Sequence, residues 1–403
     1  MQMKRIRRCV AAIEDNMSGL LLYSGALAQV PQQGGLTWLH LQFLLGFRRL
    51  GWEVLFLDRL TPEMCVNDAG HPARFEDSLN LQYFLRVMRE YGLGDSFSLN
   101  YDRGKQTVGV PRVRVLEQAA AADLFVNVMG YLDEREVLQR IRLRVFLDID
   151  PGFGQMWKEL GLHDPFRGHD RFVTLGRNIG RADCAIPTCD LNWVTMPQPV
   201  VLEKWPAQPP VPDGAFTSIG AWRGSNGPIE YQGRTYGLRV HEFRKVIGLP
   251  SRCPDSRFEM ALDIHPGDAK DIQLLQDHGW SLVDPKAVAG GPGEYQSYIA
   301  GSKAEFMVPK AMYVDTNSGL LSDRSVYYLA SGRPVLARDT GIRDLYPTGE
   351  GLLTFATLEE AAAHVETINQ DYTRHCRTAR EITLEYFDSD KVLTRLLADL
   401  DVG

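Results

Sequence analysis

Short apolar runs alternate with helical patterns through the first half of the chain. Leu20–Tyr23 has the pattern of a buried strand, a glycine-rich loop follows, and Thr37 is placed to cap a helix that continues to Leu50. Gly51 ends that helix in the usual way, and Trp52–Leu57 is another apolar strand. Strand, loop, helix and strand form a βαβ unit. Such a unit predicts a parallel sheet that binds ligands at the carboxyl ends of its strands.

The same alternation continues to about residue 195. Asp123–Met129 and Leu143–Ile149 are aliphatic runs that each lead into a loop with glycine or proline. The segment 133–142 between them predicts a crossover helix. Residues 1–195 therefore predict one Rossmann-like domain.

A proline-rich segment then interrupts the pattern. Six prolines fall between residues 197 and 212, a density that no helix or central strand tolerates. We predict a semi-rigid linker over residues 196–212.

After the linker the pattern of strands and helices starts again. Residues 213–375 predict a second α/β domain, and helices over 376–403 are expected to cross back to the first. The predicted strands of this half are Thr217–Ala221, Ala261–Ile264, Trp280–Val283, Glu305–Val308, Val335–Ala337 and Leu352–Phe355. The expected fold class is α/β, with two Rossmann-like domains facing each other across a cleft, a preferred place for small ligands.

Composition narrows the class of protein. The chain has 403 residues, 44% hydrophobic and 24% charged, which are ordinary globular values. Its apolar runs are far shorter than the roughly 20 residues of a membrane helix, so no membrane span is expected. The basic start, Met1–Arg8, is followed by Glu14 and Asp15 where an export signal would be apolar. We therefore expect a cytoplasmic protein.

Charge and cysteine content argue against two classes of partner. The net charge of −7 gives no general attraction to nucleic acid or anionic lipid, although it does not exclude a local basic groove. The six cysteines form no Cys-x-x-Cys pair, and no Asp-x-Asp lies in a loop suited to a metal ion. No metal site is therefore expected. Dinucleotide, P-loop and nucleophile-elbow motifs are also absent.

The segment 318–341 holds the residues that are best suited to binding a ligand. Ser318 and Gly319 permit a tight turn, and Ser322 can cap a short helix whose first amides would face forward. Such a helix start offers unpaired N–H groups and a partial positive charge, which suit a diphosphate. Arg324 can add a charge-assisted hydrogen bond. A plain capped helix in an α/β domain is the alternative interpretation.

This segment resembles the donor-binding region of GT-B glycosyltransferases, which use nucleotide sugars. The matching stretches are Leu329–Val335 and Asp339–Gly341. His278–Trp280 and the N-terminal Gly34–Gly35 loop are similar to further parts of that fold. The resemblance implies transfer of a hexose or pentose from a nucleotide-diphosphate sugar, without a metal ion or other cofactor. It places the donor in the second domain and the acceptor in the first.

The chain departs from the family at one informative place. Many retaining members carry two glutamates seven residues apart, and the corresponding positions here are Gly319 and Tyr327. The ribose contact of the second glutamate must then come from elsewhere, with Asp323 and Asp339 as candidates. We interpret the chain as a divergent branch whose acceptor, nucleotide base, sugar and stereochemistry the sequence leaves open.

The resemblance also assigns site residues. Arg223 follows the strand Thr217–Ala221 like a phosphate-side basic residue of the family, although a surface arginine fits equally well. The donor-binding candidates are Gly34, Gly35, Arg223, Ser318, Gly319, Ser322, Asp323, Arg324, Ser325, Asp339, Thr340 and Gly341.

An inverting reaction also needs a base near the acceptor. Asp150 is the candidate, because it ends the strand 143–149 and lies two residues after Asp148, a spacing that places both carboxylates on one side and can raise one pKa. A turn-capping aspartate is the alternative interpretation, and His169–Asp170 is a rival pair. Two alternatives to a transferase stay open: a nucleotide-sugar epimerase on the same fold, and a non-catalytic nucleotide-sugar binding protein.

Overall fold

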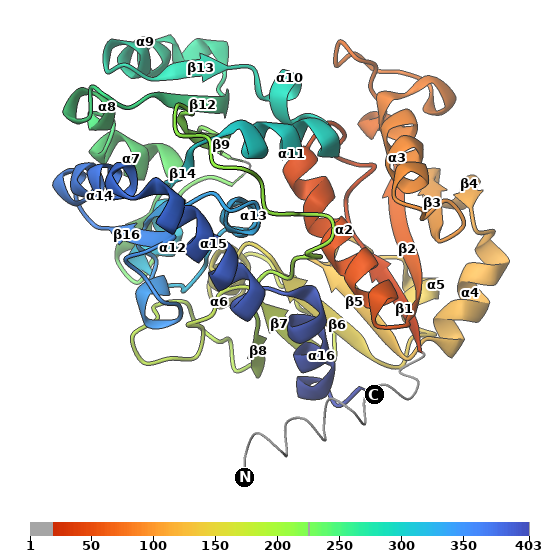
Figure 1. Ribbon diagram of the computed structural model, residues 1–403. Helices are drawn as coiled ribbons and strands as arrows, with labels where there is room; N and C mark the ends of the chain where they lie inside the picture. The colour runs from red at the N-terminus through yellow and green to blue at the C-terminus, as the bar shows by residue number, and fades with distance from the viewer. Residues whose placement is uncertain (1–18, 225, 403) are drawn as a thin grey trace.

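The computed structural model describes residues 19–224 and 226–402, which form two α/β units side by side (Figure 1). The basic stretch Met1–Arg8, with Glu14 and Asp15, lies outside the described residues. Each unit has a largely or wholly parallel sheet, so the expected α/β class with two Rossmann-like halves is confirmed. All ten strands named from the sequence overlap observed strands.

The first unit has an eight-stranded sheet in the order β4-β3-β2-β1-β5-β6-β7-β8. Neighbouring strands are parallel except β3 and β4, and the order reverses between β1 and β5. The strands are β1 Leu20–Ser24, β2 Glu53–Leu60, β3 Phe97–Tyr101, β4 Gln106–Gly109, β5 Leu124–Val128, β6 Arg144–Asp148, β7 Arg171–Thr174 and β8 Trp193–Thr195. The helices are α2 Gly34–Arg49, α3 Leu79–Glu90, α4 Arg112–Ala121, α5 Arg135–Leu138 and α6 Phe153–Glu159.

The second unit has six parallel strands in the order β13-β12-β9-β14-β15-β16, which is the Rossmann strand order. The strands are β9 Phe216–Ala221, β12 Phe258–Asp263, β13 Ser281–Val283, β14 Ala304–Met307, β15 Val335–Arg338 and β16 Leu352–Phe355, with a hairpin of β10 Ile229–Tyr231 and β11 Arg234–Tyr236. The helices are α7 Arg239–Lys245, α8 Leu249–Arg252, α9 Ala269–Asp277, α10 Pro285–Ala289, α11 Pro292–Gly301, α12 Ala311–Asp315, α13 Asp323–Ala330, α14 Leu358–Gln370, α15 Tyr372–Tyr386 and α16 Ser389–Asp399.

Two helix predictions for the first unit were wrong in detail. Thr37 does not cap α2, because the helix begins three residues earlier at Gly34, and the Thr37 hydroxyl instead pairs with the Tyr83 hydroxyl at 2.7 Å. The predicted helix over 133–142 is only the single turn α5. Its continuation tightens into i→i+3 hydrogen bonds, such as Arg140 N to Val137 O at 3.0 Å.

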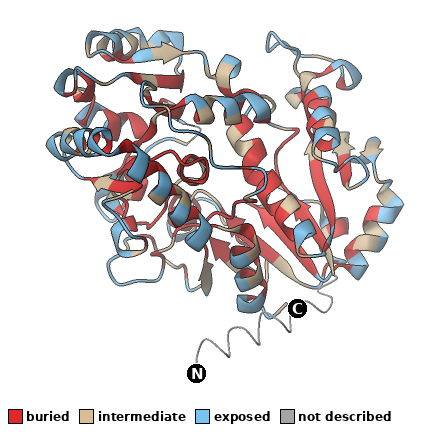
Figure 2. Cartoon of the chain, viewed as in Figure 1, coloured by how far each residue is buried: buried red, intermediate tan, exposed pale blue. Residues whose placement is uncertain are grey.

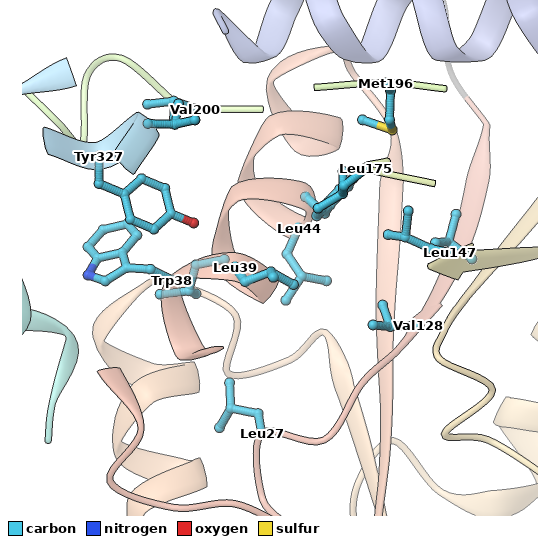
Figure 3. Close-up of a cluster of buried hydrophobic side chains, with 14 of the residues drawn as sticks. Leu27, Trp38, Leu39, Leu44, Val128, Leu147, Leu175, Met196, Val200 and Tyr327 are labelled. Atoms are coloured by element: carbon cyan, nitrogen blue, oxygen red, sulfur yellow. The ribbon is translucent and has the colours of Figure 1, made fainter. Parts of the chain in front are cut away.

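Helix α2 joins the two units. Figure 2 shows it as a largely buried element, and its N-terminal end packs against α11 of the second unit. A Cβ on Gly34 would lie 2.5 Å from the carbonyl oxygen of Ala289, so only glycine permits this approach. The Trp38 indole donates a hydrogen bond to the carbonyl of Pro292 at 2.9 Å. The core drawn in Figure 3 therefore continues from α2 to Tyr327 of the second unit.

The proline-rich segment is fixed to both units. Trp205, which is 1% exposed, stacks on Tyr327 with ring centroids 4.7 Å apart and meets the edge of Trp38 at 4.9 Å. The Val201 amide donates to the Gln42 side chain at 2.7 Å, and Arg333 donates to the carbonyl of Pro209 at 2.8 Å. This segment is a packed strap between the units.

The chain crosses between the units a second time at its end. Helix α15 leads from the second unit to α16, which packs on α2, and Figure 1 shows this crossing. The two crossings are hydrogen bonded to each other, from Val200 N to Phe387 O at 2.7 Å and from Ser389 N to Val200 O at 2.9 Å. Arg49 and Asp390 add an ion pair at 2.9 Å.

Replacing Trp205 tests how strongly the strap holds the units. We expect Trp205→Ala to lower the free energy of unfolding by about 3–5 kcal/mol, because it leaves a large cavity against Trp38 and Tyr327. Urea denaturation followed by circular dichroism measures this, with Trp205→Phe as the control that keeps an aromatic ring. A loss below about 1 kcal/mol for the alanine variant would contradict a buried role for the strap.

Candidate functional site

Two cavities lie where the units face each other. The larger, of about 1090 Å³, is bounded by the start of α2, the carboxyl ends of β9, β12 and β13, and the start of α13. The smaller, of about 210 Å³, lies at the carboxyl ends of β9 and β14, where the strand order of the second sheet reverses. That reversal is the usual ligand position in such sheets. Both cavities are lined by Gly220, Ala221, Arg223, Gly224, Asp323 and Arg324.

Helix α13 begins at the wall of both cavities. Ser322 is at the N-cap position, as predicted, but its hydroxyl donates to the Asp323 carboxylate at 3.1 Å and does not cap the helix. Ser322 therefore leaves the first amides of the helix uncapped, and the Asp323 carboxylate lies beside the amides of residues 323 and 324. Burial raises the pKa of Asp323, which Arg324 opposes.

Two arginines meet beside Gly220. Arg239, the first residue of α7, donates to the Ile219 carbonyl at 3.3 Å and to the Ser218 hydroxyl at 2.5 Å. Arg324 of α13 donates to the same carbonyl at 2.7 Å, and its Nε donates to the Glu305 carboxylate at 2.5 Å. A Cβ on Gly220 would lie 2.4 Å from Nη1 of Arg239, so glycine lets the guanidinium approach the strand.

Arg239 has no carboxylate partner in the described part of the chain, whereas Arg324 pairs with Glu305 and also lies next to the Asp323 carboxylate. Burial, and then the charge of Arg324, lower the pKa of Arg239, but a guanidinium stays charged at physiological pH. Glu305 is buried and pairs with Arg324, while Oε2 of Glu305 and Nε of Arg239 are buried without a hydrogen-bond partner among residues 19–224 and 226–402. An anion in the smaller cavity, whose wall includes Arg239, would compensate this charge.

A second set of contacts crosses from one unit to the other. Lys310, which follows β14, places Nζ 2.5 Å from Oδ2 of Asp150, and the Tyr313 hydroxyl donates to the same carboxylate. Lys310 and Tyr313 line the smaller cavity. Asp150, which follows β6 of the first unit, is therefore held beside the smaller cavity by two residues of the second unit.

Asp148 differs from Asp150 in its surroundings. It is buried, and Gln155 and Thr174 donate to its Oδ2 at 2.7 and 2.9 Å. Burial raises its pKa to about 6. The Asp150 amide donates to Oδ1 of Asp148 at 3.2 Å, so the turn-capping aspartate of this pair is Asp148.

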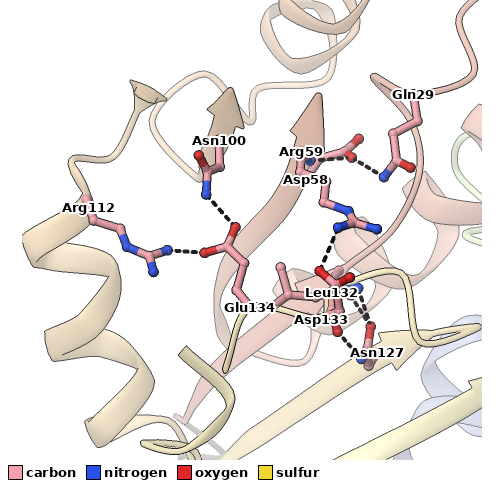
Figure 4. A network of polar contacts seen from close by, with 10 residues as sticks. Gln29, Asp58, Arg59, Asn100, Arg112, Asn127, Leu132, Asp133 and Glu134 are labelled. Carbon is pink, nitrogen blue, oxygen red and sulfur yellow. Dashed lines mark hydrogen bonds and ion pairs between the residues drawn. The ribbon is translucent and has the colours of Figure 1, made fainter. Parts of the chain in front are cut away.

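A polar network supports the loop before α2 (Figure 4). The buried Asp58 of β2 accepts hydrogen bonds from the Ala28 amide at 2.6 Å and from Gln29 at 2.9 Å, and burial raises its pKa to about 7. Arg59 pairs with Asp133 at 2.6 Å. Asp58 thus fixes the loop that leads to Gly34 and the cleft.

The structure brings half of the predicted donor residues to the cavities. Gly34, Gly35, Arg223, Asp323 and Arg324 line the larger one, and Ser322 lines the smaller. Arg223 also pairs with Asp268 at 2.6 Å.

The other six predicted donor residues form the support behind α13. Gly319 N donates to Thr340 O at 2.7 Å, and the Thr340 hydroxyl donates to Leu320 O at 2.7 Å. Asp339 accepts from the Gly341 amide at 2.9 Å and pairs with Arg343. None of the six lines either cavity: Ser318, Gly319, Ser325, Asp339, Thr340 and Gly341. Ser325 is the exception to this supporting role, because it lies within α13 and its buried hydroxyl has no hydrogen-bond partner in the described part of the chain.

The rival pair has structural partners. His169 contacts the Asn127 side chain at 3.0 Å, and Asp170 pairs with Arg144 at 2.9 Å.

Sequence reasoning missed Arg239, Glu305 and Lys310. None of the three lies in a recognisable motif, and only the packing of α7, α13 and β14 brings them together.

Two further observations concern the described residues only. In residues 19–224 and 226–402, no three His, Cys, Asp or Glu side chains are grouped closely enough to hold a metal ion. None of the helices in that part of the chain combines the length and the apolar character that a bilayer span requires.

No protein-family model matches the chain, and no curated protein matches its sequence. Solved structures do match. An alpha-glucosyltransferase in complex with UDP-glucose and DNA containing an abasic site has a TM-score of 0.60 and 11% identity, and the match covers 95% of this chain and 100% of that one. HepE of Anabaena, in complex with UDP and glucose, has a TM-score of 0.55 and 13% identity, over 95% and 99% of the two chains.

AviGT4, a glycosyltransferase involved in avilamycin A biosynthesis, has a TM-score of 0.52 and 12% identity, over 95% of this chain and 97% of that one. All three matches extend over both units and the segments that join them. This chain therefore has the GT-B fold, in which two Rossmann-like units face each other across a cleft.

Proposed function

We propose that this chain transfers a sugar from a nucleoside diphosphate sugar to an acceptor, without a metal ion. The observation that carries the proposal is the Arg239 guanidinium, which lies beside Arg324 on the cavity wall and which, among the described residues, hydrogen bonds to the Ile219 carbonyl and the Ser218 hydroxyl but to no carboxylate. In this reaction negative charge grows on the leaving diphosphate as the glycosidic bond breaks. Fixed cations and amides at that place lower the barrier directly.

The two units would divide the substrates between them. The larger cavity, at the carboxyl ends of β9, β12 and β13, is of the size that ligand sites have, and we assign the nucleoside to it. The acceptor is assigned to the first unit, on the side of Asp150. The two most similar structures named above bind UDP or UDP-glucose, which makes UDP the first nucleotide to test.

Asp323 is our candidate for the ribose or sugar hydroxyls. The other candidate, Asp339, is committed to the Gly341 amide and to Arg343 and does not line the cavities, whereas Asp323 lines both. Asp323 is also four residues before Tyr327, the position at which the family places its glutamate. The two residues therefore lie one helical turn apart on one face of α13.

Asp150 is our candidate for the base of an inverting transfer. Lys310 and Tyr313 hold its carboxylate beside the smaller cavity, close to the proposed diphosphate site. In this position it can accept the proton of an acceptor hydroxyl as the new bond forms.

Replacement of Arg239 separates a binding role from a structural one. We expect Arg239→Met to weaken UDP binding roughly 10- to 100-fold, because a charge-assisted hydrogen bond to phosphate is lost. The melting temperature without ligand should stay the same or rise, since a buried cation without its own carboxylate is removed. Isothermal titration with UDP and a thermal melt measure the two effects.

Arg377→Met, on the exposed side of α15, is the matched control for that experiment. Unchanged UDP affinity in Arg239→Met would overturn the proposed diphosphate site. The parallel change of Arg324 needs Glu305→Gln in the same chain, because Glu305 would otherwise be left as a buried unpaired carboxylate.

Replacement of Asp150 tests the base. We expect Asp150→Asn to slow sugar transfer, or the slower transfer to water, by roughly 100- to 10,000-fold while UDP affinity changes little. Tyr313→Phe is the control, since it removes a hydrogen bond to Asp150 but keeps the carboxylate. The readout is UDP released from a UDP-sugar, with product analysis.

An unchanged rate in Asp150→Asn would exclude Asp150 as the base. Two other outcomes point away from a transferase. A product isomerised at C2 would indicate an epimerase, and UDP binding without turnover of any UDP-sugar would indicate a binding protein.

A further inference from the structure

A third cavity lies outside the cleft, where the chain crosses between the units. It has a volume of about 300 Å³ and shares no lining residue with the two cavities of the cleft. We call it the hinge cavity. Its principal lining residues are Arg177, Val194, Met196, Leu345, Tyr346 and Leu396.

The walls of the hinge cavity come from every part that joins the units. Arg177 and β8 belong to the first unit, and Leu345 and Tyr346 to the second. The remaining wall is the start of the strap, the end of α15 and α16. The strap and the α15–α16 crossing are hydrogen bonded to each other through Val200. A molecule in this cavity therefore touches both units and both connections between them.

Two polar side chains of the hinge cavity, Arg177 and Tyr346, have hydrogen-bonding groups left free by residues 19–224 and 226–402. Within the residues that the structure describes, Nη1 of Arg177 makes a single long hydrogen bond, of 3.4 Å to the Thr195 carbonyl, and its buried Nε has no partner. The Tyr346 hydroxyl makes no hydrogen bond within the described part of the chain. Burial raises the pKa of Tyr346 to about 12, and the nearby positive charge of Arg177 opposes this shift.

The other charged residues of this cavity already have partners. Lys391 pairs with Glu385 at 3.0 Å, and Arg395 pairs with Asp399 at 3.5 Å, all at exposed positions. Among the described residues, Arg177 is the lining cation without a carboxylate partner. The rest of the wall is largely apolar, from Val194, Leu345, Val392 and Leu396.

We propose that the hinge cavity binds a small organic carboxylate with an apolar body. The carboxylate accepts hydrogen bonds from Arg177 and Tyr346, and the hydrocarbon part packs on the valine and leucine side chains. Because such a ligand contacts both units, it stabilises their present arrangement and changes the affinity of the cleft for UDP by linkage. The effect on UDP rests on the proposed function, whereas binding in the hinge cavity does not.

Titration with 2-naphthoate and octanoate tests the binding. At least one of them should bind with a Kd of roughly 1 mM or below. The uncharged 2-naphthamide or octanamide of the same shape should bind at least roughly 10-fold more weakly, as expected for loss of a charge-assisted hydrogen bond. No binding by either carboxylate, or equal binding by acid and amide, overturns the proposal.

Variants locate the site. Arg177→Gln should weaken carboxylate binding at least roughly 10-fold, and Tyr346→Phe should weaken it roughly 3- to 10-fold without loss of a protein hydrogen bond. Leu396→Trp should block it by filling the cavity, and Arg377→Gln on the exposed side of α15 should leave it unchanged. Unchanged binding in both Arg177→Gln and Tyr346→Phe overturns the assignment, and Tyr346→Phe keeps the test decisive if Arg177→Gln fails to fold.

The link to the cleft is read from UDP titrations with and without saturating carboxylate. We expect the UDP affinity to change at least roughly threefold in the wild type and not in Arg177→Gln. Unchanged UDP affinity in the wild type overturns the coupling. Absence of UDP binding under all conditions would instead count against the proposed function, and carboxylate binding would still be measured independently.

Discussion

The buried pair of guanidiniums beside Gly220 is the interaction on which the site depends. A cation removed from water costs several kcal/mol unless it is paired, yet Arg239 has no carboxylate partner among the described residues, since Glu305 pairs with Arg324 and Asp323 lies beside Arg324. The Ile219 carbonyl, which receives a hydrogen bond from each arginine, offsets part of this cost. Gly220 lets the Arg239 guanidinium approach the strand. Such a site is incomplete without an anion, and its position at the strand-order reversal gives that anion access from the cleft.

Much of the fold followed from local pattern. Apolar runs identified the six strands of the second sheet and the central strands β1, β2, β5 and β6 of the first, because strands of a parallel sheet are buried on both faces. The outer strands β3, β4, β7 and β8 of the first sheet were not predicted. Helix starts were harder to place: α2 begins at Gly34 because its glycines pack against α11, a tertiary contact that Thr37 cannot reveal. The strap was predicted from its prolines, but the burial of Trp205 between two units depends on side chains far away in sequence.

The candidate site likewise contains residues that a local sequence pattern predicts and residues that only tertiary packing brings together. Asp323 and Arg324 were predicted because a turn followed by a helix start is a local signal, and both line the cavity wall. Ser318, Thr340 and Gly341 belong to the same local signal but support the helix start from behind. Arg239 and Glu305 had no local signal, since one begins a helix after a hairpin and the other lies in a buried strand.

Tyr327 stands where many retaining members of the GT-B family carry a glutamate, and this difference relates the packing of the strap to the chemistry of the site. A glutamate at this position would have to lie against Trp205 in the buried contact between the units, where an unpaired carboxylate is costly. The tyrosine ring instead stacks on Trp205, and the strap is fixed by that contact. A carboxylate one turn earlier on the same face, at Asp323, keeps an acidic group at the cavity wall without burying it in the strap. The packing that closes the units and the chemistry of the cleft thus impose opposite demands on one face of α13, and the chain satisfies them at two positions four residues apart.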